Sequence, residues 1–554
     1  MYIRSIYLNM ADHTVLQESL ESQDNSVPFE SKKWTYITDS SSSAGVFSGQ
    51  IQFDLNTLSS QNQWTNLSEA YVQFPVKLNI KSTGTAAALG TNFSGTIKNG
   101  FHQFIDSCQI SLGGTTIQSS QIFENINAQF KILTSWSTDE LNKYGSTLGL
   151  ALDDYVEAVG TTAASLDSVA IATTMPTFAG TSLPVANNPG YLERSRNNAS
   201  IDTANTAAAL LGATNISFTG KRPVQITTGA VTAGFDVFTA FYLATVRLKD
   251  ISDVCSKLPL IKGMKGFIYL NYNAAQSVAI YSDATTVSAA PTNTSIYGRI
   301  MPGLFNRIGF AATAGDTYTL SADVSGVKSA NLTTATPTRT EARLYAPYFV
   351  ASPAVDRALT MKKTIRYLER YVRPMTVEAS GTLNQTLTPG ITNPKMVILF
   401  PYNYNTVAPL TTAGLLTMQR NPLLSPFDTV PATTSPFAGI QNLQITVGNV
   451  PMFQNPVNMN FEMFMNEVAQ LGQDGGLDSE TTLSGLLNER KWNQLYRFYA
   501  CNVGRRMGSD DGASKSVQVS LQNSTGQAMS IIAIVLYERE LTVDTALGSI
   551  VQGL

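Results

Sequence analysis

Few residues of this chain have the types and spacing that catalysis requires. The sequence holds two histidines, His13 and His102, far apart in the chain. A single imidazole without a second histidine or a cysteine nearby does not complete a usual metal site. His102 lies between two phenylalanines in the stretch GFHQFID. We therefore expect His102 to have a structural role, and His13 to lie in a polar N-terminal arm.

Two acidic pairs are the other candidates for acid–base chemistry or cation binding. They are Asp153-Asp154 and Asp510-Asp511. Glycoside hydrolysis needs two carboxyl groups that converge across a cleft, which adjacency in sequence does not provide. The second pair lies in the stretch GSDDG, whose residue types favour a solvated turn. We expect neither pair to be a catalytic site.

Motifs of common nucleophilic and nucleotide-hydrolysing enzymes are missing from the sequence. The stretch GSTLG (residues 145–149) places its serine one position too early for a nucleophile elbow. No P-loop and no HExxH motif occurs. Cys108, Cys255 and Cys501 are scattered among apolar residues, so we expect buried free thiols. The sequence thus predicts no enzyme activity and no catalytic, cofactor-binding or metal-binding residues.

Composition narrows the class of protein. The 554 residues exceed what one compact core accommodates, and 43% of them are hydrophobic. Only 14% are charged, against roughly 25% in an average soluble protein. Such a surface suits a molecule packed against many neighbours, or a secreted β-protein with a hydroxyl-rich exterior. The net charge of −3 argues against sequence-specific or general nucleic-acid binding.

The elements that would position any site are mainly strands. In residues 70–80, AYVQFPVKLNI alternates apolar and polar side chains, which is typical of a strand with one buried face. Other strand-like runs recur up to MSIIAIVLYERELTV near the C-terminus. Two segments, 121–133 and 458–471, instead carry apolar residues at helical spacing. A capping box at Ser137 predicts a second short helix after the first.

One short pattern occurs twice. CQISLGGTTIQ (108–118) and LQITVGNVPMF (443–453) align Gln109 with Gln444, an offset of 335 residues. Each predicts a hairpin with glycine at the turn, and each precedes one of the two helical segments. The period is far longer than that of a solenoid or propeller. We therefore expect an all-β fold with inserted helices, built as two tandem jelly-roll β-sandwiches in one chain.

This plan resembles that of double jelly-roll major capsid proteins of icosahedral DNA viruses, including those of virophages, Polinton-like viruses and tailless phages. The resemblance lies in the QISLGGTT and QITVGNVP elements with their following helices, and in the close of the chain, SVQVSLQNSTGQAMSIIAIVLYERELTV. It spans about residues 40–545. It implies a homotrimer of pseudo-hexagonal outline that tiles an icosahedral shell around the genome, with neighbouring capsomers, penton and minor capsid proteins as partners.

The resemblance also implies that the protein is located in the virion and needs no cofactor. Shells of this family often lie over an internal lipid membrane. Two basic stretches, 247–265 and 357–373, bear on this. Lys362, Arg366 and Arg370 are even numbers apart and share one face of a strand. They could contact an anionic interior, either headgroups or genome, or pair with acidic groups of neighbouring subunits, or protect a strand edge.

The expected division is an N-terminal arm (1–30), a first jelly roll with long loops (31–300), a second jelly roll (301–545) and a C-terminal tail (546–554). Low-periodicity regions at about 155–235 and 405–437 are expected outside both cores. Two alternatives stay open: a cell-surface adhesin or surface-layer protein, and a carbohydrate-active β-sandwich enzyme. A surface protein needs an export signal or anchor, and the sequence shows neither.

Overall fold

The fold is taken from a computed structural model of the chain. Its described residues are 28–59, 63–82, 93–97, 100–150, 152, 199–200, 216–219, 222–228, 236–273, 275–281, 287–293, 302–307, 317–331, 337–403, 439–473, 486–494, 496–504, 512–526 and 528–552. His13, both acidic pairs and the loop 405–437 lie outside them.

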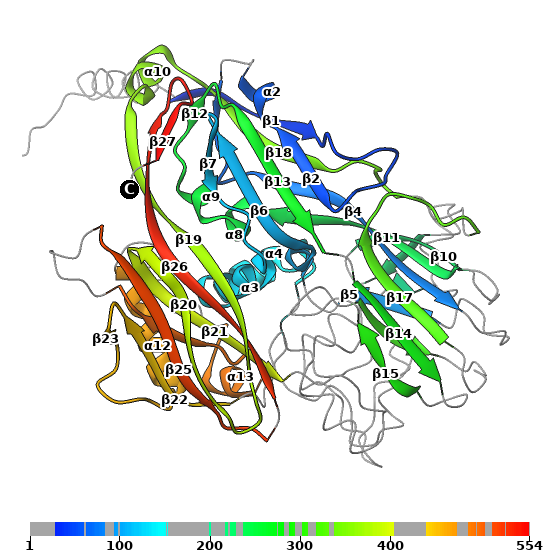
Figure 1. The fold of residues 1–554 in the computed structure, drawn as a ribbon. Coiled ribbons are helices and arrows are strands. Elements are labelled where there is room, and N and C mark those ends of the chain that lie inside the picture. The colour runs from blue at the N-terminus through cyan, green and yellow to red at the C-terminus, as the bar shows by residue number, and fades with distance from the viewer. Residues whose placement is uncertain are drawn as a thin grey trace, which may run out of the picture.

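The first sandwich has eight principal strands in two sheets (Figure 1). In chain order they are β1 (Phe29–Thr38), β2 (Gln50–Asp54), β4 (Tyr71–Ser82), β6 (Ile105–Leu112), β7 (Thr115–Gln118), β11 (Asp236–Arg247), β13 (Gly266–Tyr272) and β18 (Arg343–Ala351). One sheet runs β1-β18-β4-β11 and the other β2-β13-β6-β7. By rank in the chain, these orders are 1-8-3-6 and 2-7-4-5.

The second sandwich repeats this order. Its strands are β19 (Lys362–Val377), β20 (Thr382–Thr392), β21 (Pro394–Asn403), β22 (Ile440–Val447), β23 (Val450–Pro451), β24 (Tyr499–Asn502), β25 (Ser514–Asn523) and β26 (Met529–Asp544). The sheets run β19-β26-β21-β24 and β20-β25-β22-β23, again 1-8-3-6 and 2-7-4-5. Paired sheets with this strand order are jelly rolls, so the predicted fold class, two tandem jelly-roll sandwiches, is confirmed.

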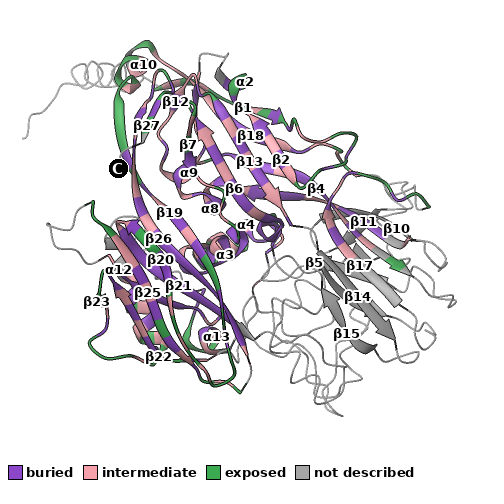
Figure 2. Cartoon of the chain, viewed as in Figure 1, coloured by how far each residue is buried: buried purple, intermediate pink, exposed green. Residues whose placement is uncertain are grey.

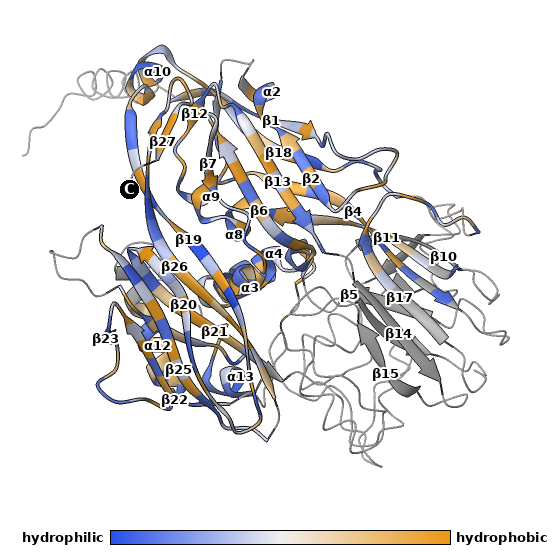
Figure 3. Ribbon diagram, in the orientation of Figure 1, coloured by the Kyte–Doolittle hydropathy of each residue, from blue (hydrophilic) through white to orange (hydrophobic). Residues whose placement is uncertain are grey.

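Each core follows from the period-two pattern of its strands. Val72, Phe74, Val76 and Leu78 of β4 are fully buried, whereas Gln73 between them is not. Buried positions alternate with more exposed ones along most strands of both sandwiches, and apolar with polar ones (Figures 2 and 3). Alternation of this kind places one face of each sheet in the core.

Helices fill the connections between strands. They are α2 (Asn56–Ser59), η2 (Phe101–Phe104), α3 (Glu124–Ser135), α4 (Thr138–Tyr144), α8 (Leu248–Ile251), α9 (Asp253–Lys257), α10 (Pro353–Leu359), α12 (Phe461–Gln473) and α13 (Glu489–Gln494). The predicted helices correspond to α3 and α12, and Ser137 forms the predicted capping box at α4. No helix in the described part of the chain is long and apolar enough to cross a membrane.

Further strands form a distal lobe at one end of the first sandwich (Figure 1). Its members are β5 (Phe93–Ile97), β8 (Ala199–Ser200), β9 (Ile216–Thr219), β10 (Arg222–Thr228), β14 (Ala275–Tyr281), β15 (Val287–Asn293), β16 (Pro302–Arg307) and β17 (Thr317–Val324). A small sheet β16-β5-β8 joins one strand from each of three different connections of the jelly roll. The hairpin of β9 and β10 extends the sheet beyond β11, so part of the region 155–235 adds strands to that sheet.

The division of the chain differs from the one expected at residue 301. The strands β17 and β18 both pair with β4 and so belong to the first sandwich. The alternation in EARLYAPYFV predicts a strand but cannot specify its partner, because pairing is a tertiary choice. We therefore propose a division at residues 352–361. In the expected tail, β27 (Ile550–Gln552) pairs with β26. The remaining short strands are β3 (Trp64–Thr65) and β12 (Ile261–Lys262).

Candidate functional site: the junction of the two sandwiches

The most distinctive cluster of polar side chains lies where the two sandwiches meet. The 16-residue strand β19 runs from the first core into the second. Ile365 and Tyr367 near its start pack in the first core, whereas Val372 and Met375 pack in the second. The Tyr367 hydroxyl donates a hydrogen bond of 2.6 Å to the Ile117 carbonyl of β7. One strand therefore fastens both sandwiches together.

A buried ion pair crosses this junction. The Arg370 guanidinium of β19 donates to the Glu124 carboxylate in the first turn of α3, and both side chains are buried. Arg370 also donates to the Gln121 carbonyl. Burial lowers the pKa of Arg370 to about 10, which leaves the guanidinium charged at neutral pH. The neighbouring Glu369 accepts hydrogen bonds from Ser119 and pairs with Arg539 at 2.6 Å.

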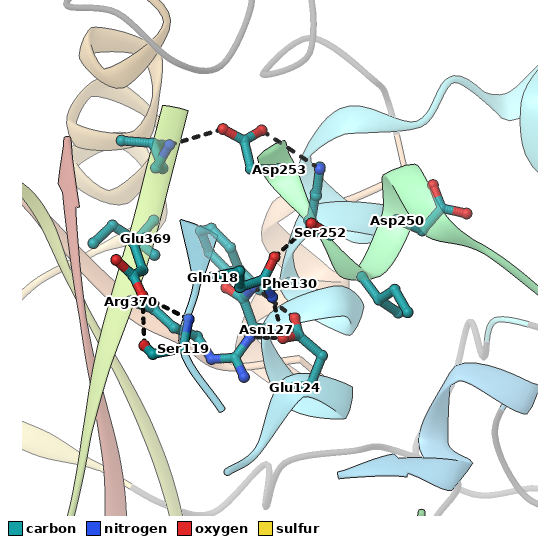
Figure 4. Close-up of a pocket in the computed structure, with 14 residues that line it drawn as sticks. Gln118, Ser119, Glu124, Asn127, Phe130, Asp250, Ser252, Asp253, Glu369 and Arg370 are labelled. Atoms are coloured by element: carbon teal, nitrogen blue, oxygen red, sulfur yellow. Dashed lines mark hydrogen bonds and ion pairs between the residues drawn. The ribbon is translucent and has the colours of Figure 1, made fainter. Parts of the chain in front are cut away.

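These groups surround a cavity between β7, α3, α8, α9, β19 and β26 (Figure 4). On its other side Lys131 of α3 lies 3.7 Å from the Asp253 carboxylate, which also accepts the Leu368 amide at 2.9 Å. Among the described residues, no group of three histidine, cysteine or acidic side chains is arranged to hold a metal ion. The carboxylates Glu124, Glu369 and Asp253 are engaged with cations and amides. The geometry is that of a structural clamp between two domains.

The predictions for His102 and the three cysteines concern buried positions in the two sandwiches. His102 is buried in η2 and its Nε2 lies 2.7 Å from the Gln129 side-chain oxygen. Burial lowers the pKa of His102 to about 4, so the imidazole is neutral at physiological pH. All three cysteines are free and buried, as predicted. Burial raises the pKa of Cys255 to about 12, which leaves its thiol unreactive. The GSTLG segment follows α4, and its Gly145 and Leu148 are buried.

Four residues of the two basic stretches, Arg247, Lys262, Arg366 and Arg370, form ion pairs within the chain. Arg247 pairs with Asp250 at 2.7 Å, and Lys262 with Asp356 at 3.0 Å. Arg366 lies 3.3 Å from Glu540 on the adjacent strand. The predicted shared face of β19 includes exposed Arg366 and buried Arg370. The sequence reasoning missed the acidic partner Glu124, because the residues of this pair are 246 positions apart.

Similarity to known proteins is found among solved structures. No protein-family pattern matches the sequence, and no curated protein matches it. Among solved structures, a Sputnik virophage structure matches with 10% identity over 95% of this chain and 89% of that one, at a TM-score of 0.50. The mavirus major capsid protein matches with 12% identity over 94% and 90%, at 0.45. The Faustovirus major capsid protein matches with 9% identity over 93% and 91%, at 0.43.

The repeated strand order and the match to the Sputnik structure both describe the fold of the whole chain. The first is internal to the chain, and the second covers both sandwiches at once. The resemblance drawn from the hairpin repeat is therefore confirmed as a likeness of fold: this chain has a double jelly-roll fold, similar to the fold in the Sputnik virophage structure.

Proposed function

We propose that this protein is a viral major capsid protein that assembles as pseudo-hexagonal homotrimers into an icosahedral shell around the genome. The observation that carries the proposal is the duplication of one jelly roll, with the same strand order in both halves. Three chains joined around a threefold axis would place six similar sandwiches in a ring, and such a ring packs in a plane. Solved neighbours of the same fold include major capsid proteins.

The ends of the molecule suggest how it would stand in a shell. The distal lobe collects the long connections of the first sandwich at one end, and α10 lies at the other (Figure 1). We assign the distal lobe to the outer surface, where long loops commonly carry recognition. The end with α10 then faces inward. Four exposed basic side chains lie on α10 or on segments next to α10 or β12: Arg357 on α10, Lys362 and Lys363 directly after it, and Lys265 after β12.

An inward cationic end suits an anionic surface, and we include an internal lipid membrane in the proposal. Flotation with vesicles tests it: binding to vesicles rich in phosphatidylserine, lost on replacing Lys362 and Lys363 by Gln, is expected. Equal flotation of wild type and variant would remove the membrane from the proposal. Penton and minor capsid proteins are the remaining partners that such a shell requires.

The proposed role is structural, with the virion as location and no reaction to catalyse. The junction supports this, because its buried charges are neutralised by one another. A cell-surface adhesin has no specific observation in its favour, since a tandem of two similar jelly rolls is not needed to bind a surface ligand. A carbohydrate-active enzyme would need converging free carboxylates, which the junction does not offer.

The native mass of the purified protein tests the assembly. Sedimentation equilibrium should give three times the chain mass of 59.7 kDa, and negative-stain averages should show a hexagonal outline. A stable monomer or dimer in mild buffer would contradict the proposal.

A further inference from the structure

One helix of the first sandwich packs on a sheet of the second, beside the contact that α9 makes with β19. Helix α3 of the first sandwich lies on the outer face of the β19-β26-β21 sheet of the second. The Phe130 ring is 6.2 Å from the Phe400 ring of β21, and 5.7 Å from Phe498. Phe123, Ile126 and Leu133 join the same cluster. The buried pair of Glu124 and Arg370 seals this contact.

Both halves of this contact have a counterpart elsewhere in the chain. Helix α3 follows β7, the fifth strand of its jelly roll, and α12 follows β23, the fifth strand of the other. The sheet that receives α3 has strands of rank 1, 8 and 3, namely β19, β26 and β21. The equivalent sheet of the first sandwich is β1-β18-β4. Helix α12 therefore corresponds to α3, and the β1-β18-β4 face corresponds to the β19-β26-β21 face on which α3 packs.

The counterpart helix is open to solvent on one side. Glu462 and Asn466 of α12 are exposed, and Met463 and Met465 beside them are half-buried. The opposite side of the helix, with Phe464 and Val468, is buried in its own sandwich. By contrast, most residues of α3 are buried, because it is covered on both sides.

The counterpart sheet face carries an aromatic patch. Trp34 and Tyr36 of the edge strand β1 are 49% and 51% exposed, which is unusual for such large side chains. The rings form a ladder across three strands: Tyr36 lies 5.9 Å from Tyr345, which stacks on Tyr71 at 5.0 Å. The Arg343 guanidinium lies over the Tyr36 ring at 4.2 Å. Tyrosine, tryptophan and arginine are the residues enriched in protein interfaces.

We infer that α12 of one copy packs on the β1-β18-β4 face of the next copy, and repeats between chains the junction that α3 makes within the chain. The occupant is a second copy because that copy presents the same helix, after the same hairpin, as the one seated on the equivalent face. Glu462 lies in the first turn of α12 as Glu124 does in α3. It would approach the patch near Arg343, which within the chain pairs with Glu341 at 2.6 Å.

Helix α12 and the strands β1, β18 and β4 lie in different parts of the molecule, α12 in the lower left of Figure 1 and the three strands in its upper half. Each chain thus offers one helix and one face, so the contact is head-to-tail and closes into a ring when the rotation permits. This inference rests on the proposed trimer and names the surfaces that hold it together.

Two charge substitutions test it, one on each surface. Tyr36→Asp and Met465→Asp should each convert the trimer to a folded monomer at concentrations where the wild type is wholly trimeric. Leu547→Asp is the control, because Leu547 is 73% exposed in the turn between β26 and β27 and belongs to neither surface. It should leave the trimer intact. Circular dichroism and the melting temperature establish that each monomer is folded.

Cross-linking tests the contact without depending on the loss of an assembly. The double variant Tyr36→Cys/Asn466→Cys, treated with a short bismaleimide, should give covalent dimers and trimers on a denaturing gel. Each single variant should give neither, because the native thiols are buried. If both aspartate variants remain trimers, or if no cross-links form, the inference is overturned and the proposed function still stands. A wild-type protein that forms no trimer would overturn both.

Discussion

Gly113 and Gly448 occupy the same position in two equivalent hairpin turns. Gly113 has φ +57° and is followed by Gly114 at +82°, while Gly448 has +56° and is followed by Asn449 at +67°. In each hairpin the flanking residues pair directly, so both loops have two residues. Positive φ at both positions is the type I′ turn that matches the twist of the strands. Each turn joins the fourth and fifth strands of its jelly roll.

These turns predict unequal costs for the same substitution. Gly113→Ala and Gly448→Ala should both lose about 1 kcal/mol, since a side chain is strained in the left-handed region. At Gly113 the new Cβ would also meet the Gly548 carbonyl at 3.1 Å, whereas at Gly448 it would meet only the flexible Lys515 side chain at 3.4 Å. Urea unfolding should therefore rank Gly113→Ala as the more destabilising. The reverse order would contradict this account of the turns.

The buried pair at the junction predicts strong coupling. Arg370→Met or Glu124→Met alone leaves one buried charge without its partner, at a cost of about 3–5 kcal/mol. The double variant removes both charges and should be far more stable than the sum of the two losses implies. A double-mutant cycle from denaturant unfolding measures this. Additive losses would mean that the two side chains do not act as a pair.

The control is the exposed ion pair of Arg366, which lies on the same strand as Arg370. Arg366 is 66% exposed and pairs with Glu540. Arg366→Met should change the free energy of unfolding by roughly 0–1 kcal/mol, because solvent screens exposed ion pairs. A loss as large as that of Arg370→Met would show that burial is not what distinguishes the two arginines.

His102 predicts a pH-dependent loss of stability. Its pKa falls from 6.5 to about 4 on folding, so between these values the unfolded chain binds a proton that the folded chain does not. Stability should therefore fall as the pH falls through this window, by about 1.4 kcal/mol per pH unit from this residue. Below pH 4 the titration of His102 should cause no further loss of stability. His102→Gln should show a correspondingly shallower slope from pH 6.5 to 4; parallel slopes would contradict the assignment.

The cysteines predict inertness in the native protein. Burial raises the pKa of the Cys108 and Cys255 thiols, and Cys501 is buried as well. Ellman's reagent at pH 8 should release no colour from the native protein and three equivalents after addition of guanidinium. Prompt release of one equivalent from the native protein would show that a thiol is accessible.

The sequence pattern was sufficient for much of this architecture. Alternation identified the strands, and the paired motifs around Gln109 and Gln444 identified the duplication with its two helices. These features are local, because side-chain direction in a strand or helix follows from spacing alone. The capping box at Ser137 was predictable for the same reason.

The long-range choices could not be predicted in this way. The strand Arg343–Ala351 was assigned to the wrong half, because its residues fit either sandwich and only pairing with β4 decides. Glu124, the partner of Arg370, could not be predicted either, since nothing near Arg370 in sequence indicates α3. The aromatic patch on β1 follows from three strands far apart in the chain, which the sequence does not align.

A cryo-electron microscopy map of the purified oligomer, at a resolution that separates strands, tests the central claim most directly. The account predicts three chains around a threefold axis, with six jelly rolls in a ring. It further predicts α12 of each chain seated on the β1-β18-β4 face of the next, as α3 is on β19-β26-β21. A monomer, a twofold assembly, or a ring in which first and second sandwiches do not alternate would contradict it.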